Sequence, residues 1–362
     1  PPARDALVAA GALDAAATVS TGSPALNLCW MRDNDPAAFE RTESFVIGPD
    51  WVVFKLTGNL GTDYCEASTS SLFSFSTHTW SNEALDALGL PDRILPSIRG
   101  ACEIAGYVTD EASCVTGLPM GVPVVVGTGD NPAAAIPTGC ITQNATVISL
   151  GTSGVLMGQR PDSAPSAKGK RIAFSLDGRT FVTLVQGVVQ SCCSSRDWLL
   201  RDVLRVSYSE AEARLEECLH KTGDVLFFPH MNGEKTLFGD PTLRGSFMGL
   251  SLDVTPVDLD RALLEGIGYG FRQLSDEMGF SDDRSPVHVV GGGARSDAWL
   301  QILADILNRP MQRMEGETGA GYGAAILASM ATADDGGIDA ASAVRVGATF
   351  EPRDENLQRH NE

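Results

Sequence analysis

Asp130 and Asn131 stand between an apolar run and an alanine-rich stretch, in the sequence VVVGTGDNPAAAIPTG. The β-branched run predicts a buried strand over residues 122–128, and Pro132 suits the first turn of a helix that continues to Ile136. A carboxylate exposed at such a strand end can accept the proton of a hydroxyl that attacks a phosphorus atom. A side-chain amide beside it can hold the same substrate. The pattern equally allows a purely structural role, because aspartate is a favoured helix N-cap, worth roughly 1 kcal/mol.

Two more polar, glycine-rich turns follow predicted strands, in the sequences SLGTSG and GGGARS. Ligands of α/β proteins bind beyond the carboxyl ends of strands. Glycine at such turns lets backbone amides approach a phosphate, and Ser or Thr adds hydroxyl donors. Three such turns in one chain indicate a nucleotide site.

Other common sites do not match. Ser296 and Pro132 stand where the dinucleotide-binding fingerprint needs its third glycine. The chain contains no G-x-x-x-x-G-K-[ST] sequence, and the turn at residues 151–154 is one residue too short for a G-x-S-x-G nucleophile elbow. None of the five histidines is placed as the partner of a catalytic serine.

The elements that must position these turns alternate between strands and amphipathic helices, which predicts an α/β fold. Strands are expected at 145–150, 180–186, 224–228 and 287–290, and a helix at about 188–203. A long helix is expected from Pro256, capped by Thr255, with one apolar stripe. Its members are Leu263, Ile267, Phe271, Leu274 and Met278. Ser296 or Asp297 is expected to cap the next helix, and a last helix near 320–330 is rich enough in glycine and alanine to pack closely against another backbone.

Composition limits the class of partner. The chain has 362 residues with 43% hydrophobic residues and a formal net charge of −19, which argues against nucleic acid or an anionic membrane as the main partner. No apolar run approaches the roughly 20 residues of a membrane span. The eight cysteines are scattered without a Cys-x-x-Cys pair, so zinc sites and disulfides are not expected, and reduced thiols in a cytoplasmic protein are.

Taken together, the motifs resemble those of the FGGY carbohydrate kinases. The stretches GTGDNPAAAIPTG and ATVISLGTSGVLMG resemble the strand, Gly-Asp-Asn, helix and phosphate-turn pattern of the family's xylulokinases. The family's adenosine-binding segment is resembled by HVVGGGARSDAWLQILADILNRPM. The segment between the phosphate turn and the adenosine-binding segment is resembled by FFPHMNGEKTLFGDP, and the family's first signature by SPALNLCWMRDNDP. The similarity covers nearly the whole chain in the right order.

The resemblance implies an actin-like ATPase (ribonuclease H-like) α/β fold with two domains and a cleft between them. The domains would be residues 1–139, the remainder of the sugar-binding domain, and residues 140–350, the ATP-binding domain. It implies transfer of the γ-phosphoryl group of ATP, with Mg²⁺, to a hydroxyl of a small sugar, most closely D-xylulose. It also leaves a homodimer open as the assembly.

The same resemblance assigns roles residue by residue. Asp130 would be the catalytic base, and Asn131 and Glu234 would belong to the substrate site. The residues expected to contact ATP are Gly151, Thr152, Ser153, Gly292, Gly293, Ala294 and Asp297.

Departures from the family pattern bear on activity and substrate. No Asp-x-Gly-[Ser/Thr] phosphate loop and no Met-His pair occurs in this sequence, so we expect the chain to begin inside the first domain and to lack contacts to Mg·ATP and sugar. Asn27 replaces the usual Lys of the first signature, and Lys235 and Leu237 replace the usual Arg and Pro. The alternatives are a catalytically inactive nucleotide- or sugar-binding member, a kinase for another pentulose, polyol or sugar acid, and an ATPase that needs no sugar.

Overall fold

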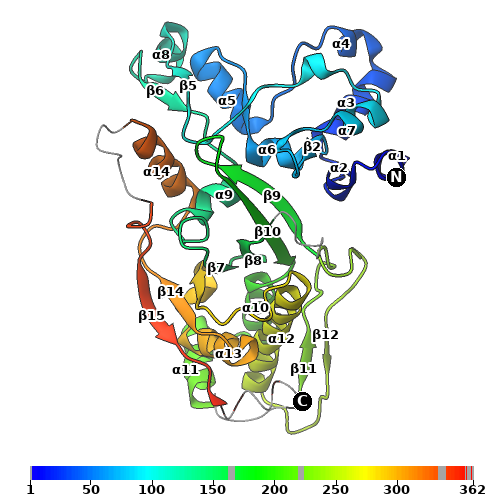
Figure 1. The fold of residues 1–362 in the computed structure, drawn as a ribbon. Coiled ribbons are helices and arrows are strands. Elements are labelled where there is room, and N and C mark those ends of the chain that lie inside the picture. Colours follow the sequence, from blue (N-terminus) through cyan, green and yellow to red (C-terminus); the bar gives the residue numbers. More distant parts are fainter. Residues whose placement is uncertain are drawn as a thin grey trace.

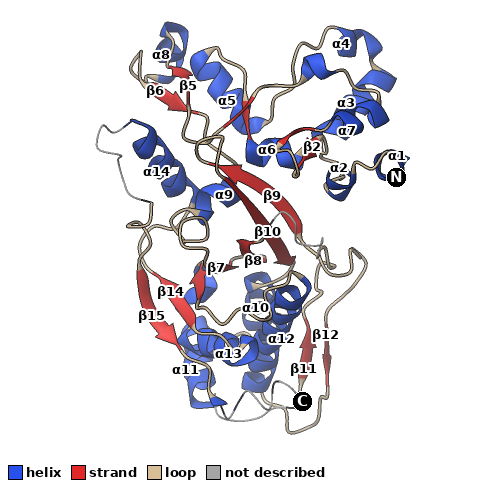
Figure 2. Cartoon of the chain, viewed as in Figure 1, coloured by secondary structure: helices blue, strands red, loops and turns tan. Residues whose placement is uncertain are grey.

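The computed structural model describes residues 2–161, 168–218, 224–332, 340–354, 356 and 360. The chain has an α/β architecture in which small helices form one end and a large mixed sheet forms the other (Figures 1 and 2). The first part contains α1 (Pro2–Ala9), α2 (Leu13–Ala17), α3 (Pro24–Asn34), α4 (Pro36–Glu40), α5 (Gly48–Thr57), α6 (Tyr64–Thr69), α7 (Asn82–Leu88) and α8 (Asp110–Thr116). Its short strands are β1 (Thr62–Asp63), β2 (Phe73–Ser74), β3 (Thr79–Trp80), β4 (Ile98–Arg99), β5 (Ile104–Tyr107) and β6 (Pro123–Val125).

The large sheet has seven strands in the described part of the chain, in the order β15-β14-β13-β7-β8-β10-β9. The pairs β7–β8, β8–β10, β10–β9 and β14–β15 are antiparallel, whereas β13 is parallel to both β7 and β14. The strands are β7 (Thr146–Leu150), β8 (Gly154–Gln159), β9 (Lys170–Ser175), β10 (Phe181–Val189), β13 (Val287–Val290), β14 (Met311–Met314) and β15 (Val346–Phe350). A separate pair is formed by β11 (Leu226–Phe228) and β12 (Ser246–Met248).

The main hydrophobic core lies between this sheet and the helices α12 (Pro256–Glu277) and α13 (Asp297–Leu307). Thr255 and Asp258 form a capping box at the start of α12, as predicted. The predicted apolar stripe is fully buried, with every member 0% exposed. On α13, the Ser296 side chain accepts the hydrogen bond of the Trp299 amide, which decides between the two predicted caps.

Helix α9 (Asp130–Ala135) packs against helix α14 (Ala320–Thr332). A Cβ built on Gly323 would lie 1.8 Å from the carbonyl oxygen of Ala133, so this contact requires glycine. The close approach of the last helix to another backbone was predicted from its composition, and α9 is the backbone that it contacts.

The β9–β10 hairpin extends from the sheet into the helical end of the molecule (Figure 1). The amide of Ala101 donates to the Ser175 oxygen over 2.9 Å. The Ala173 amide donates over 3.0 Å to the hydroxyl of Ser68, which lies on α6. Backbone hydrogen bonds therefore join the hairpin to elements from the first third of the chain.

The strand predicted over residues 122–128 is shorter and less buried than expected. It covers only Pro123–Val125 and pairs with β5 alone, outside the large sheet. Val122 is 39% exposed, whereas Val126 is 9% exposed. An apolar β-branched run predicts a strand, but whether both of its faces are covered depends on tertiary packing.

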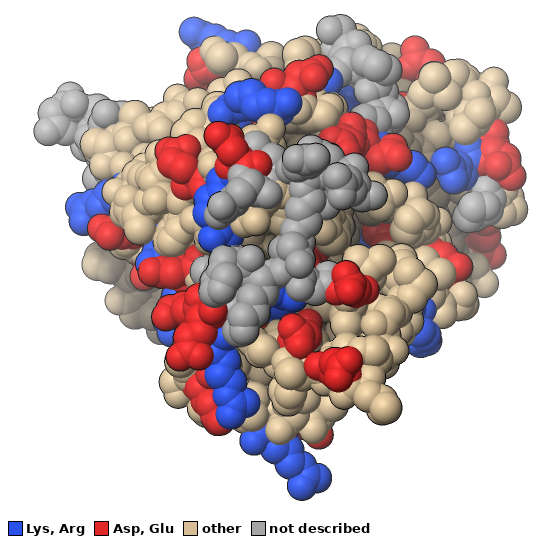
Figure 3. Space-filling model, turned by 90° about the horizontal axis from the view of Figure 1, so that it is seen from below, with Lys and Arg blue, Asp and Glu red and all other residues tan. Residues whose placement is uncertain are grey.

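The surface charges, the helix lengths and the cysteines can be compared with what the composition predicts. Asp and Glu side chains are interspersed with Lys and Arg over the described residues of the face in Figure 3. Among the described helices, none combines the length and apolar character needed to cross a membrane. The cysteines whose side chains are described are unpaired thiols, and the side chain of Cys218 lies outside that set.

Candidate active site

The turns after β7 and β13 lie side by side because the two strands are parallel neighbours. Gly291 adopts a φ of +93°, and a Cβ there would lie 2.6 Å from the carbonyl oxygen of Leu150. A Cβ on Gly293 would lie 2.6 Å from the ring of Trp299 and 2.8 Å from Leu150 Cβ. Glycine is therefore required at both positions for the two turns to approach each other.

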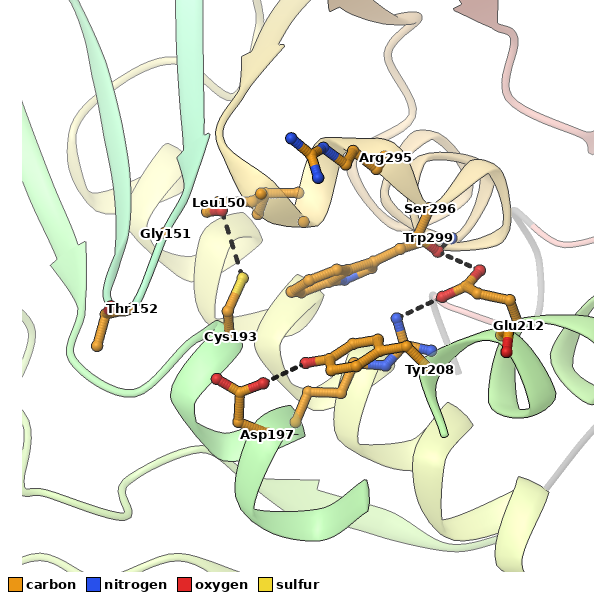
Figure 4. A pocket seen from close by; sticks show the side chains of 14 residues that line it. Leu150, Gly151, Thr152, Cys193, Asp197, Tyr208, Glu212, Arg295, Ser296 and Trp299 are labelled. Atoms are coloured by element: carbon orange, nitrogen blue, oxygen red, sulfur yellow. Dashed lines mark hydrogen bonds and ion pairs between the residues drawn. The ribbon is translucent and has the colours of Figure 1, made fainter. Parts of the chain in front are cut away.

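Beside these two turns lies a cavity of about 580 Å³, within the size range of small-molecule sites (Figure 4). Its walls come from both turns, from the helical segment that follows β10, and from α11 (Tyr208–Cys218). The lining residues are Leu150, Gly151, Thr152, Cys193, Arg196, Asp197, Tyr208, Ser209, Glu212, Gly292, Gly293, Arg295, Ser296 and Trp299.

A buried ionic network holds one wall of this cavity. The guanidinium of Arg196, a residue that is 2% exposed, donates to both carboxylate oxygens of Asp260, over 2.9 and 2.8 Å. It also donates to Glu212 over 2.6 Å, and Glu212 in turn accepts from the Ser296 hydroxyl over 2.8 Å. This chain of contacts joins α12, α11 and the start of α13, so the wall is fixed before any ligand enters.

Tyr208 and Trp299 both belong to the wall of the same cavity (Figure 4). The Tyr208 hydroxyl donates to Asp197 over 2.6 Å, and its ring lies 5.4 Å from the Arg196 guanidinium carbon. Trp299 is 1% exposed, and its indole Nε1 has no hydrogen-bond partner.

Several of the residues expected at ATP do line this cavity. They are Gly151, Thr152, Gly292 and Gly293. Three others do not line it. Ser153 donates its hydroxyl to the Gln190 carbonyl over 2.9 Å, Ala294 is buried with its carbonyl accepting from Arg313, and Asp297 is exposed and ion-paired to Arg313.

Asp130 is exposed at the first position of α9, and Gly129 occupies the N-cap position without any capping side chain. The Asp130 carboxylate accepts one hydrogen bond, from the neighbouring Asn131 amide over 2.8 Å. The structural alternative, an N-cap aspartate, is therefore not what the structure has. Neither Asp130 nor Asn131 lines the cavity beside the glycine turns.

The turn that carries Asp130 rests on two carboxyl groups, one from Asp63, the N-cap of α6, and one from Glu66 on α6. Asp63, 3% exposed, accepts the hydroxyl hydrogen of Thr128 over 2.5 Å. A Cβ on Gly129 would lie 2.8 Å from a carboxylate oxygen of Glu66. Burial raises the pKa of Asp63 to about 6, and burial together with the charges of nearby aspartates, Asp130 among them, raises the pKa of Glu66 to about 7.

Glu234 is buried inside its own turn. Its carboxylate accepts from the amides of Thr236 and Phe238 over 2.9 and 2.6 Å. Burial works to raise the pKa of Glu234, but these backbone donors outweigh it and the net shift is downward. The observed contacts order the turn itself, and a direct contact of Glu234 with substrate stays a prediction.

Family comparison matches both parts of the chain. Residues 14–137 match the N-terminal domain of the FGGY family of carbohydrate kinases, and residues 146–332 match its C-terminal domain. The chain belongs to the FGGY family.

Xylulose kinases are among its similar relatives. The chain is 29% identical to a xylulose kinase of Bacillus subtilis over 92% of its own length and 67% of the relative's. It is 30% identical to a xylulose kinase of Escherichia coli K12 over 86% of its own length and 64% of the relative's. It thus spans about two thirds of the length of these relatives. The crystal structure of a xylulose kinase from Rhodospirillum rubrum superposes with a TM-score of 0.80 at 26% identity, covering 94% of this chain and 70% of that one.

These comparisons confirm the predicted actin-like, two-domain FGGY fold. The structure also places in the cavity wall some residues that the sequence did not single out: Cys193, Arg196, Tyr208 and Glu212. Trp299 belongs both to the hydrophobic core and to the wall of the cavity. The polar turn QSCCSS after the third predicted strand was an available signal for Cys193, because β10 ends beside Gly154 of the phosphate turn. No comparable signal marks Tyr208 or Glu212.

Proposed function

We propose that this FGGY-family chain takes part in ATP-dependent phosphorylation of a sugar hydroxyl, with D-xylulose as acceptor and D-xylulose 5-phosphate as product. The observation that carries the proposal is the exposed Asp130 carboxylate, held on a turn that Asp63 and Thr128 fix, in a chain whose glycine turns border a nucleotide-sized cavity. In a carbohydrate kinase the acceptor hydroxyl must lose a proton as it attacks the γ-phosphorus, and a free carboxylate can take it.

The cavity supports the nucleotide half of the proposal. Amides of the turns at Gly151 and Gly293 would face phosphate oxygens, while Tyr208 offers surface for an aromatic base. Asn131, half-buried beside Asp130, is proposed to hold a sugar hydroxyl. Contacts of Ser153, Ala294 and Asp297 with ATP stay predictions, since these residues border the two turns but do not line the cavity.

Mg²⁺ would enter as a ligand of the ATP phosphates and neutralise charge on the transferred group. No group of three or more His, Cys, Asp or Glu side chains that could hold a metal occurs among the described residues. Mg²⁺ keeps several waters and usually binds through one or two carboxylates together with substrate phosphates.

The acceptor is proposed as D-xylulose because the xylulose kinases above are the matched relatives. Lys235, at the position where xylulokinases have Arg, keeps the positive charge but not the planar fork, which favours testing other pentuloses, polyols and sugar acids in parallel. An inactive nucleotide- or sugar-binding member of the family is the second candidate, because Asp130 and Asn131 do not line the cavity that the glycine turns border.

The test is coupled ADP release by the full chain with a panel of sugars, in wild type and Asp130→Ala. We expect ADP release that depends on D-xylulose and falls about 10²- to 10⁴-fold in the variant, the usual contribution of a general base. Asp110→Ala, an exposed aspartate in the first turn of α8, is the matched control. Turnover that is unchanged in Asp130→Ala would rule out the base assignment, and ATP binding without turnover on any sugar would favour the inactive member.

A further inference from the structure

Asp197 places a carboxylate in the wall of the cavity beside the glycine turns (Figure 4). It is the last residue of α10 (Cys193–Asp197), four residues after Cys193, so the two side chains lie on the same face of this helix. The helix starts against the turn expected to face phosphate, because the Cys193 amide donates to the Gly151 carbonyl over 3.0 Å. The Asp197 carboxylate therefore follows that turn along the cavity wall.

On its other side, the Asp197 carboxylate is joined to the aromatic part of the wall. The Tyr208 hydroxyl donates to Asp197 Oδ1 over 2.6 Å, which fixes the carboxylate in place. Tyr208 is 46% exposed, so its ring is open to a ligand, and the wall continues to Glu212, four residues further along α11. Asp197 thus lies between the part of the cavity that would take phosphates and the part that would take an aromatic base. In a nucleotide, the ribose occupies this place.

One oxygen of this carboxylate is left for a ligand. Asp197 is exposed, and the side-chain hydrogen bond described for it uses Oδ1 and not Oδ2. The guanidinium of the adjacent Arg196 donates instead to Asp260 and Glu212. An anionic oxygen repels phosphate, whereas a hydroxyl can donate a hydrogen bond to it. The 2′- and 3′-hydroxyls of ribose are such donors, and acidic side chains bind ribose hydroxyls in dinucleotide sites by the same chemistry.

We propose that Asp197 accepts a hydrogen bond from a ribose hydroxyl of the bound nucleotide and thereby makes the cavity select ribonucleotides over deoxyribonucleotides. The ribose contact rests on the proposed function, which takes this cavity as the nucleotide site. A deoxyribonucleotide would displace water from Asp197 Oδ2 without replacing its hydrogen bond. Selection therefore comes from the cost of leaving a charged acceptor without a donor.

The experiment measures the Kd of ADP, 2′-deoxyADP and 3′-deoxyADP by calorimetry, with the full chain and with EDTA present to remove Mg²⁺. Wild type should bind ADP about 10- to 100-fold more tightly than at least one of the deoxy analogues, the usual range for a hydrogen bond to a charged group. Asp197→Ala should lose this preference, because ADP binds more weakly while that analogue binds as before. Asp197→Asn, which keeps the size and one acceptor oxygen, should show an intermediate preference.

Tyr208→Phe is the matched control. It removes the same hydrogen bond between Tyr208 and Asp197 that Asp197→Ala removes, but it leaves the carboxylate in the cavity wall. This variant should keep the preference of wild type for ADP, whatever happens to its affinity for all three nucleotides. Equal loss of the preference in Tyr208→Phe and Asp197→Ala would overturn the ribose contact, because the carboxylate alone would then not select.

The outcomes separate the ribose contact from the proposed function. If wild type binds ADP and both deoxy analogues equally well, the ribose contact is overturned while the nucleotide assignment of the cavity stands. If none of the three nucleotides binds, the nucleotide assignment fails and the ribose contact fails with it. A second set of titrations replaces EDTA with Mg²⁺. If Asp197→Ala weakens ADP binding only in that set, the carboxylate acts on the metal and the ribose contact is overturned.

Discussion

Thr128 connects the proposed catalytic turn to Asp63, the N-cap of α6, through one side-chain hydrogen bond. Thr128→Val keeps the shape but leaves the buried Asp63 carboxylate without that donor. We expect the free energy of unfolding to fall by about 1–3 kcal/mol, the cost of an unsatisfied buried group. Because Asp130 follows two residues later, kcat should fall more than KM rises. Urea denaturation and steady-state kinetics measure the two effects.

Thr128→Ser is the control for this prediction, since it restores the hydroxyl while removing a methyl group. It should recover most of the stability and of kcat. A loss in the Ser variant without a loss in the Val variant would mean that the methyl group, and not the hydrogen bond to Asp63, matters at this position.

The raised pKa of Glu66 predicts how the stability of the chain depends on pH. Its pKa is about 7 in the folded chain against an ordinary value of 4.5, so between these pH values the folded state binds more protons than the unfolded state. The folded chain is therefore destabilised by this group as pH rises through that window. The charged groups that act on it are Asp63, Asp50 and Asp130, which raise its pKa, and Lys170, which lowers it.

Glu66→Gln removes this titration and should be more stable relative to wild type at pH 8 than at pH 5. Urea denaturation at both pH values measures the difference. Glu216→Gln, an exposed carboxylate on α11, should show the same difference from wild type at both pH values. A Glu66→Gln effect that does not change with pH would contradict the assigned direction.

At the scale of elements, the packing of α14 on α9 sets the position of the helix that begins with Asp130. Gly323→Ala would place a methyl group 1.8 Å from the Ala133 oxygen, which forces the helices apart. We expect a loss of about 1–3 kcal/mol in stability, typical of overpacking, and a drop in kcat. Gly321→Ala, on the same helix with nothing within 4 Å of its Cβ, should be neutral or stabilising by up to about 1 kcal/mol. Thermal unfolding of both variants measures these changes. If Gly321→Ala lost as much stability as Gly323→Ala, the close contact between α14 and α9 would be refuted.

Element patterns predicted more of the fold than of the site. The cap and stripe of α12, the strand β13 and the close packing of α14 follow from local rules on capping, periodicity and residue size. The strand before Asp130 was misjudged, because its pattern does not say that β5 is its only partner. The Arg196–Glu212 wall was missed for the same reason, since it joins elements that only tertiary packing brings together.

At the scale of the whole molecule, the β9–β10 hairpin links the helical end to the large sheet. A shared hydrophobic cluster joins Tyr64, Phe73 and Phe75 to Ala173 of β9. Arg171 of the hairpin forms an ion pair of 2.9 Å with Asp14 on α2. These contacts should couple the unfolding of the two ends.

Tryptophans at both ends can test this coupling. Trp30, Trp51 and Trp80 report on the helical end, and Trp198 and Trp299 on the sheet end. One variant carries Phe in place of the tryptophans of the helical end, and the other carries Phe in place of those of the sheet end. The fluorescence of the two variants should give coincident urea transitions, as expected of a single cooperative unit. If the two fluorescence signals gave different urea midpoints in these tryptophan variants, the hairpin would not couple the two ends.

The hairpin contact can then be broken at Gly100, where a Cβ would lie 2.6 Å from both the Gly178 amide and the Leu176 oxygen. Gly100→Ala must displace the hairpin, so we expect the two transitions to separate, with the helical end unfolding at the lower urea concentration because its core cluster is the smaller one. Gly48→Ala, at the start of α5 with nothing within 4 Å of its Cβ, should leave them coincident. If Gly100→Ala instead lowers both midpoints together, the coupling runs through the buried side chains of the cluster and not through this backbone junction.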